Sequence, residues 1–360
     1  MRISIGKAYL VAALCVCAAF VAAILGFARL EENRYIGMQL SSARKMAEAE
    51  AYLKEKMLAL GIEPEAEDIN ETLLFGPEFT ELTSTPGAVE AKRTSLDPNF
   101  AAAMVRYYRK AGLKKGDTLA IGASGSFPGL AIAAVIAATE YGLRTEAIVS
   151  LGASMHGATR VEFNIFDILL SVKDAGYADF DLLAISRGGA NDEGGSVMEG
   201  LIFEGTPQLA YDICRKVADE TGAEFLVYDS LLDNMNRRIE LFGDVDMFVN
   251  VGGALINQGV GMEGHSFPQG LILDRQPLPD VKVKGLCYEY SARGIPVLNL
   301  LNVKQLAADN GIPFDPVPLS KPEDCVVQSE TRYSLALIIL GIVSTTFILA
   351  VGVVLSRKKK

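Results

Sequence analysis

The fold is decided by the stretch TLAIGASGSFPGLAIAAVIAATEYGL, residues 118–143. It begins as an apolar strand pattern, passes through the small residues GASGSFPG (122–129), and restarts at once as an apolar helix pattern that ends near Tyr141. A strand, a glycine-rich turn and a helix in this order form the first half of a βαβ unit. The loop either brings its backbone close to a ligand or only makes a tight turn, and this stretch leaves both readings open.

Strand and helix patterns alternate through the rest of the central chain. Strands are expected in 117–123, 145–153, 181–189, 224–230, 246–254 and 294–301, and helices in 97–112, 129–141, 166–177, 206–223, 231–243 and 302–311. Strands that alternate with helices of this length are typical of a parallel sheet covered on both faces. The sequence therefore predicts an α/β fold with a doubly wound, mostly parallel, Rossmann-like sheet.

Each end of the chain carries an uncharged apolar run, 8–28 and 334–355, long enough to cross a membrane as a helix. The first run is longer than the core of most signal peptides, so an uncleaved anchor is favoured over a cleaved signal. The basic tail 357–360 places both termini in the cytoplasm and the intervening chain outside it, at the cell (inner) membrane. The resulting segments are a cytoplasmic N-terminus (1–7), a transmembrane helix (8–28), a membrane-proximal helix and loop (29–91), an extracytoplasmic α/β domain (92–312), a Pro-rich stalk (313–333), a transmembrane helix (334–355) and a basic cytoplasmic tail (356–360).

The charge of the central chain limits its partners. Between the apolar runs, 28 Lys and Arg face 44 Asp and Glu, which gives a net charge of −16. So acidic a body is a poor general binder of nucleic acid, and any anion must be bound locally. The cysteines outside the apolar runs, Cys214, Cys287 and Cys325, are isolated, so they form at most one disulfide or remain core thiols. Their spacing indicates no metal site, and no nucleotide motif indicates a cofactor.

Three predicted strands end in loops of small residues: 122–129, 186–195 and 250–261. In open α/β sheets, ligands bind beyond the carboxyl ends of the strands, and backbone N–H groups in such loops suit a carboxylate or phosphate. The candidate ligand-binding residues in these loops are Gly122, Gly125, Gly188, Gly189, Asn250, Gly252 and Gly253. The alternative is that all three loops only make tight turns.

A basic segment precedes the first loop. Arg106, Arg109 and Lys110 are candidates for attracting a polycarboxylate to the domain, although a solvated helix face explains them as well.

Serine chemistry is a second interpretation of the first loop. GASGS (122–126) partly resembles the nucleophile elbow GxSxG, with Ser124 at its centre and Ser126 in place of the last glycine. A serine nucleophile needs a base, and the chain has only His156 and His265. The candidate catalytic residues are Ser124, Ser126 and His265, while the alternative treats both histidines as surface loop residues.

Four stretches resemble the poly-gamma-glutamate system protein family, membrane proteins of bacterial poly-γ-glutamate capsule systems: KRTSLDPNFAAAMV (92–105), KKGDTLAIGASGSFPGLAIAAV (114–135), AIVSLGASMHGA (147–158) and VDMFVNVGGA (245–254). The resemblance covers most of residues 90–310, and GASGSFPGL is its most specific part. Met155 and His156 stand where that family more often has Ser-Trp, which speaks against a shared catalytic role for His156.

The resemblance implies a pathway rather than a reaction. It favours a membrane-anchored accessory of poly-γ-glutamate production or export that binds the polymer, or another carboxylate ligand, outside the membrane. A serine-dependent hydrolase or transferase acting on the polymer is one alternative, and a structural partner of the synthase subunits is another.

Overall fold

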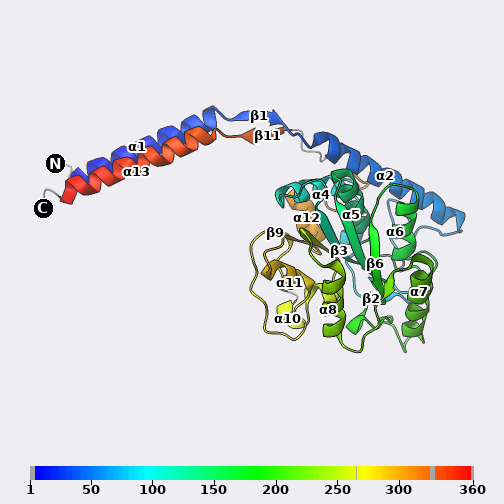
Figure 1. Cartoon of the computed structure of the whole chain (residues 1–360). Helices are drawn as coiled ribbons and strands as arrows, with labels where there is room; N and C mark the ends of the chain where they lie inside the picture. The colour runs from blue at the N-terminus through cyan, green and yellow to red at the C-terminus, as the bar shows by residue number, and fades with distance from the viewer. Residues whose placement is uncertain (1–4, 265, 325–328, 358–360) are drawn as a thin grey trace. The chain divides into compact units, whose positions relative to one another are not determined.

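The computed structural model describes residues 5–264, 266–324 and 329–357 (Figure 1). It divides into two compact units, a terminal unit of Met1–Ile36 with Val327–Lys360 and a central unit of Gly37–Val326.

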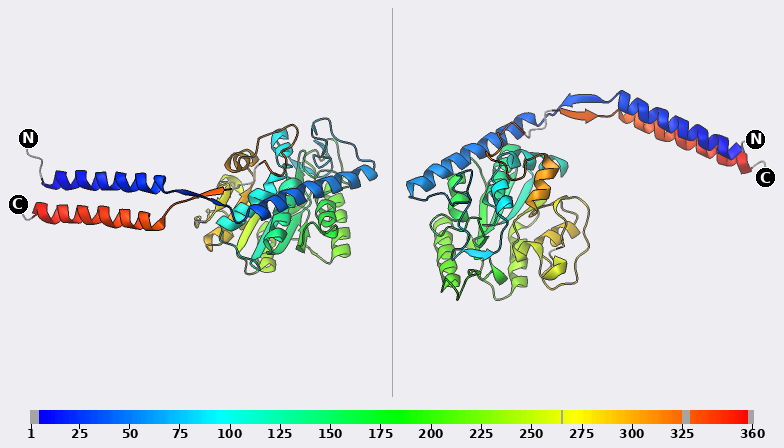
Figure 2. Two further views of the ribbon diagram at one scale, coloured as in Figure 1. Left: turned by 90° about the horizontal axis from the view of Figure 1, so that it is seen from above. Right: turned by 180° about the vertical axis from the view of Figure 1, so that it is seen from behind.

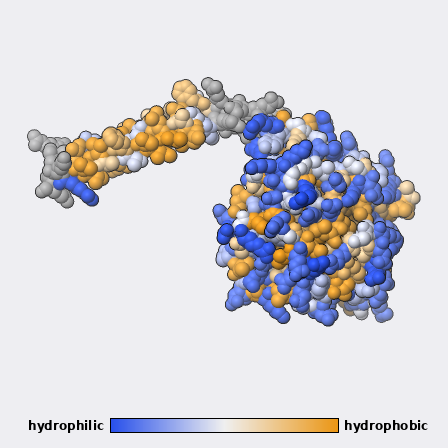
Figure 3. Space-filling view, in the orientation of Figure 1, coloured by the Kyte–Doolittle hydropathy of each residue, from blue (hydrophilic) through white to orange (hydrophobic). Residues whose placement is uncertain are grey.

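The terminal unit is a helical hairpin extended by two short strands. Its elements are α1 (Ile5–Gly26), β1 (Arg29–Glu32), β11 (Ser329–Arg332) and α13 (Leu335–Arg357). The helices pack antiparallel, with Gly341 against Phe20 and Gly352 against Tyr9. Both are long and apolar enough to cross a membrane, and their surfaces are largely hydrophobic in Figure 3. The two predicted spans therefore coincide with two candidate membrane helices.

The chain next to these helices differs from the prediction. We expected a helix to begin directly after residue 28, but β1 intervenes and pairs antiparallel with β11, for example Leu30 with Thr331. The helix that follows, α2 (Ile36–Ala59), lies across α4, α5 and α6 of the central unit (Figure 2). Its Lys45 pairs with Glu140 at 2.5 Å, and its Lys56 donates to Ser171 at 2.8 Å.

The central unit contains a seven-stranded sheet in the order β7-β6-β4-β3-β8-β10-β9. All neighbouring strands pair parallel except β9 with β10. The strands are β3 (Thr118–Ser124), β4 (Arg144–Ser150), β6 (Asp181–Ser186), β7 (Glu224–Phe225), β8 (Met247–Val251), β9 (Gly270–Ile272) and β10 (Val297–Leu300). The α/β class and the mostly parallel sheet are thus confirmed.

Helices cover both faces of this sheet. They are α3 (Val89–Thr94), α4 (Asn99–Lys110), α5 (Pro128–Tyr141), α6 (Ile165–Asp174), η1 (Ala190–Asp192), α7 (Thr206–Thr221), α8 (Leu231–Phe242), α9 (Leu255–Gln258), α10 (Gly261–Gly264), α11 (Leu286–Ala292) and α12 (Val303–Asn310). The short elements β9, α9, α10 and α11 were not expected from the sequence.

The stretch that decides the fold is the centre of the core. Every residue of β3 is buried, and so is every residue of α5 except Thr139 and Glu140. The helix is apolar on all sides because it packs against β3 and β4 as well as α4 and α6. Pro128 begins the helix, and Gly142, with φ of 78°, ends it.

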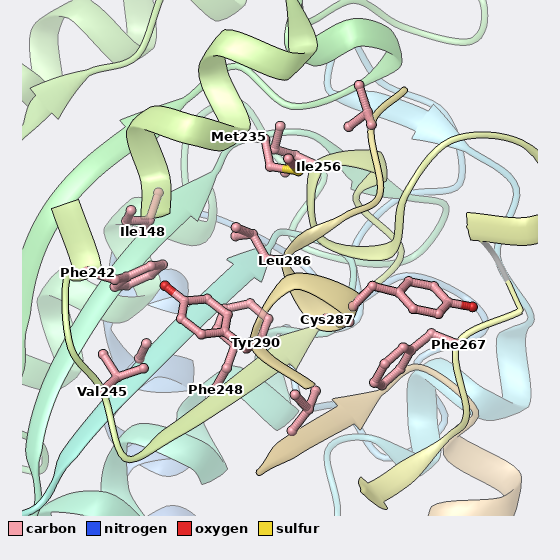
Figure 4. Close-up of a cluster of buried hydrophobic side chains, with 14 of the residues drawn as sticks. Ile148, Met235, Phe242, Val245, Phe248, Ile256, Phe267, Leu286, Cys287 and Tyr290 are labelled. Atoms are coloured by element: carbon pink, nitrogen blue, oxygen red, sulfur yellow. The ribbon is translucent and has the colours of Figure 1, made fainter. Parts of the chain in front are cut away.

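The opposite face carries a cluster of aromatic and aliphatic side chains (Figure 4). Phe248 of β8 stacks on Tyr290 of α11, with ring centroids 4.9 Å apart, and meets Phe242 of α8 edge-on. Burial of these rings holds α8 and α11 against the sheet.

Two segments that we expected to be a loop and a stalk are part of the central unit. Within 62–91, β2 (Thr83–Thr85) pairs parallel with β5 (Ala153–Ser154). Of the Pro-rich segment, the described residues 313–324 are bonded to the α3–α4 region: Asp315 pairs with Arg93 through two hydrogen bonds of 2.6 and 2.7 Å. These residues therefore belong to the folded body.

The first turn of α5 should not tolerate a side chain. A Cβ on Gly129 would lie 2.3 Å from the carbonyl oxygen of Ser95, so we expect Gly129→Ala to lower the free energy of unfolding by about 1–3 kcal/mol. The control is Gly37→Ala in α2, where a Cβ meets nothing within 4 Å and should be neutral or stabilise by up to about 1 kcal/mol. Urea unfolding of the full chain in detergent measures both, and equal stability of the two variants would contradict the packing.

Candidate functional site

A cavity of about 420 Å³ opens at the carboxyl ends of the central strands, next to the point between β3 and β8 where the strand order reverses. We call it the serine pocket. It is lined by Ser84, Thr85, Pro86, Gly87, Ala88, Ala91, Lys92, Ser124, Ser126, Phe127, Ser150, Gly152, Ser154, Gly188, Gly189, Ala190, Gly253, Ala254, Leu255 and Leu301.

Three adjacent strands end in serines at the same level. In the parallel register Ser124 of β3 is opposite Ser150 of β4, which is opposite Ser186 of β6. The hydroxyls of Ser150 and Ser186 are 2.8 Å apart. Ser124 and Ser150 line the pocket, and the hydroxyl of Ser186 is buried behind them.

Lys92 reaches the pocket from α3. Its Nζ donates to the backbone carbonyl of Ser126 and lies 2.5 Å from Oγ of Ser154. The Phe127 ring centroid is 4.3 Å from the same nitrogen, and only 2% of the lysine is exposed. Burial without a carboxylate partner lowers the pKa of Lys92 to about 7, because desolvation disfavours the charged amine.

A buried ion pair fixes the loop of residues 186–195 beneath the pocket. Arg238 of α8 is fully buried, and its Nη2 lies 3.2 Å from the Asp192 carboxylate and 2.7 Å from the Ser186 hydroxyl. The Asp192 carboxylate also accepts from the backbone N–H of Gly188 at 2.9 Å. Desolvation lowers the pKa of Arg238, whereas its contact with the Asp192 carboxylate raises it. Because this charged hydrogen bond favours the ionised forms of both groups, the pair is ionised.

A network of side-chain amides supports the loop of residues 250–261. Asn250 donates to Asn299 at 2.8 Å and to the carbonyl of Gly252, while Asn257 donates to Asn250 at 2.9 Å and to the carbonyl of Gly122. All three asparagines are fully buried. Their amide groups hold β3, β8 and β10 in register at the base of the loops.

Some of the pocket's backbone donors have no partner. Within the described residues, the N–H groups of Phe127, Gly189 and Gly253 make no hydrogen bond to the protein. Phe127 also precedes the positive end of α5. The lining whose structure is described contains one cation, several hydroxyls and these donors, and no Asp or Glu.

Five of the predicted site residues line the serine pocket: Ser124, Ser126, Gly188, Gly189 and Gly253. The other predicted loop residues, Gly122, Gly125, Asn250 and Gly252, are not part of the lining.

Two of these glycines are required by close packing. A Cβ on Gly252 would lie 2.4 Å from Oγ of Ser124, and one on Gly125 would lie 2.9 Å from the carbonyl of Leu151. The absence of a side chain at these two positions therefore allows the loops to pack closely against each other, rather than bringing the backbone close to a ligand.

The basic residues predicted to attract a ligand are elsewhere. Arg106, Arg109 and Lys110 lie on α4 and are not part of the pocket lining. Arg106 donates to Gln39 and to Asn310, and Lys110 borders a separate cavity of about 600 Å³ beside Asp309. The structure does not bring them to the glycine loops.

The histidines give no base for Ser124 or Ser126 within the described lining. His265 lies outside the described residues. His156 is buried rather than on the surface: it has φ of 61°, stacks on Phe75 at 4.5 Å, and its Nδ1 is 3.2 Å from the carbonyl of Gly76. Its contacts are those of a packed core residue.

Among the described residues, no group of three or more His, Cys, Asp or Glu side chains is arranged to hold a metal. Cys214 and Cys287 are buried free thiols, and Cys325 lies outside the described residues.

Comparison with known proteins identifies no relative of this chain: no protein-family model matches it, and no curated protein is significantly similar to it.

The buried lysine should make stability depend on pH. Between its folded pKa of about 7 and its unfolded value of 10.5, the unfolded chain binds a proton that the folded chain does not, so stability rises with pH across this window. Compared with Lys92→Met, the wild type should gain roughly 3–5 kcal/mol in unfolding free energy from pH 7 to 10.5.

Urea unfolding of both full-length proteins at several pH values measures this difference. The control is Lys216→Met, which removes a lysine whose side chain is 74% exposed. A flat difference for Lys92→Met would show that Lys92 keeps its ordinary pKa.

Proposed function

We propose that the protein is a membrane-anchored accessory of poly-γ-glutamate production or export, and that its serine pocket binds a carboxylate of the polymer or of a related small ligand. The observation that carries this proposal is the composition of the described lining. One cation, several hydroxyls and unbonded backbone N–H groups surround a cavity without a carboxylate. This combination attracts an anion, since each of its polar groups can donate to carboxylate oxygens.

The polymer is suggested by the resemblance of residues 90–310 to the poly-gamma-glutamate system proteins. A cavity of about 420 Å³ suits a chain end or a few units rather than a long stretch of polymer. In the doubly wound, Rossmann-like arrangement that we assign to this strand order, the pocket occupies the switch point where ligands commonly bind.

The membrane location belongs to the same proposal. In it α1 and α13 cross the cytoplasmic membrane, both termini are cytoplasmic, and the acidic central unit faces outward. A body that faces outward meets the polymer after synthesis, and synthase subunits are the partners we expect within the membrane.

Binding of a γ-glutamyl oligomer should weaken as pH rises. With a pKa of about 7, the charged fraction of Lys92 falls from about nine-tenths at pH 6 to about one-tenth at pH 8, while the ligand carboxylates stay ionised. We expect up to a tenfold loss of affinity over this range, and Lys92→Met should bind weakly at both pH values. Calorimetric titration of the full chain in detergent measures this.

Two controls separate the pocket from general electrostatics. Lys216→Met removes the same charge from an exposed site and should bind as the wild type does. An oligomer with amidated carboxyl groups should not bind. Equal affinity of wild type and Lys92→Met at pH 6 would contradict the proposed site.

The topology predicts which introduced cysteines a membrane-impermeant maleimide reaches in intact cells. Lys216→Cys, on the exposed face of α7, should react, whereas Ser356→Cys, next to the basic tail, should react only after the membrane is opened. The unmodified chain measures the background from the native cysteines, of which Cys214 and Cys287 are buried. The reverse pattern would place the central unit in the cytoplasm.

A further inference from the structure

We propose that Ser154 and Lys92 form a nucleophile–base pair, which makes the serine pocket an active site for cleavage or transfer of an acyl group. The two side chains lie 2.5 Å apart, Nζ to Oγ, inside the pocket. The proposal rests on the proposed function for its substrate, a γ-glutamyl amide, and for nothing else.

A lysine activates a serine only in its neutral form, so it must be kept from water and from carboxylates. Lys92 meets both requirements, since 2% of it is exposed and the described lining contains no Asp or Glu. Its low pKa agrees with this environment.

The hydrogen bonds around Lys92 orient the amine. A neutral amine has two N–H donors and one lone pair. Because the carbonyl of Ser126 can only accept, it takes one N–H, and the second N–H and the lone pair are left. In the ground state Nζ donates to the hydroxyl of Ser154, and rotation about the C–N bond turns the lone pair toward that hydroxyl, which then donates its proton. Ser126 is therefore a positioning residue for the base.

Two contacts fix the backbone of Ser154. It belongs to β5, which pairs with β2, and its own N–H donates to Oγ of Ser126 at 3.1 Å. The hydroxyl of Ser126 is thus bonded to the backbone of Ser154, and within the described lining neither Ser124 nor Ser126 has a side-chain base at its hydroxyl. The geometry favours Ser154 over the two serines expected from the GxSxG pattern.

The pocket also has donors for the charge that develops during acyl transfer. Backbone N–H groups that are already fixed stabilise an oxyanion better than water does. Phe127, Gly189 and Gly253 contribute unbonded N–H groups to the lining. The amide carbonyl and the carboxylate of a γ-glutamyl unit are several bonds apart, so one group of donors can hold the carboxylate while another faces the reacting carbonyl.

The reaction balances without a further reagent. Oγ of Ser154 attacks the amide carbon as its proton passes to Nζ of Lys92, and Lys92 then gives this proton to the leaving amine as the C–N bond breaks. Water, or an amine in a transfer reaction, attacks the resulting ester while Lys92 takes its proton. Cleavage of the ester returns that proton to Oγ of Ser154.

A fluorophosphonate probe tests the pair directly, because it forms a covalent bond only with an activated serine. We incubate the full chain in detergent with the probe and locate the label by peptide mass spectrometry. We expect the label on Ser154, with a rate that rises about tenfold from pH 6 to pH 8 as Lys92 loses its proton. Ser154→Ala should abolish labelling, and Lys92→Met should slow it at least a hundredfold.

The chain contains a matched control for a lysine–serine hydrogen bond without shielding. Lys56 donates to Ser171 at 2.8 Å, but Lys56 is exposed. Ser171 should remain unlabelled, and Lys56→Met should leave labelling of Ser154 unchanged.

The outcomes separate this inference from the proposed function. No label, a label on Ser124 or Ser126, or labelling that does not change with pH would overturn the pair, even if a γ-glutamyl oligomer binds. A label on Ser154 with the expected pH dependence supports the pair even if the oligomer fails to bind. The wild-type label and its pH profile do not depend on whether the variants fold.

Discussion

The position of β3 between β4 and β8 is the constraint on which the other features depend. Because β3 is paired on both edges and covered on both faces, it accepts only small or apolar side chains, and its neighbours must approach at backbone distance. The serine pocket opens at the carboxyl end of this strand. The glycine loops converge there because the strand order reverses beside β3, and the pocket follows from that convergence.

Much of the fold could be predicted from the sequence because apolar strands and helices of regular length alternate between residues 117 and 311. The site was only partly predictable. Ser124, Ser150 and Ser186 each end an observed strand, whereas the strands expected from the sequence end at residues 123, 153 and 189, so the common level of these serines follows only from the register of the sheet. Lys92 could not be found from the sequence either, since its position in the core is visible only from its pairing with Ser126 and Ser154, which lie 34 and 62 residues further along the chain. Local patterns carry no information about such a pairing.

An unpaired lysine in a core opposes folding, and the surrounding structure has to compensate for it. The helix that carries it is held by Asp315 of the Pro-rich segment. Arg93, the next residue, turns to the Pro-rich segment and pairs with Asp315, while Thr94 accepts the backbone N–H of Asp315. Adjacent residues of α3 thus have opposite roles: Lys92 serves the pocket and Arg93 anchors the helix.

Because of these contacts, the folded body extends beyond residue 312. The helix pattern of the sequence stops at Gly311, which invites a truncation at residue 312. Such a shortened protein would lose Asp315, and with it the two hydrogen bonds to Arg93, as well as the carbonyl of Lys321 that accepts from Asn99. A water-soluble form that keeps its lysine in place must therefore extend at least to residue 321, although no regular helix or strand lies between residues 311 and 321.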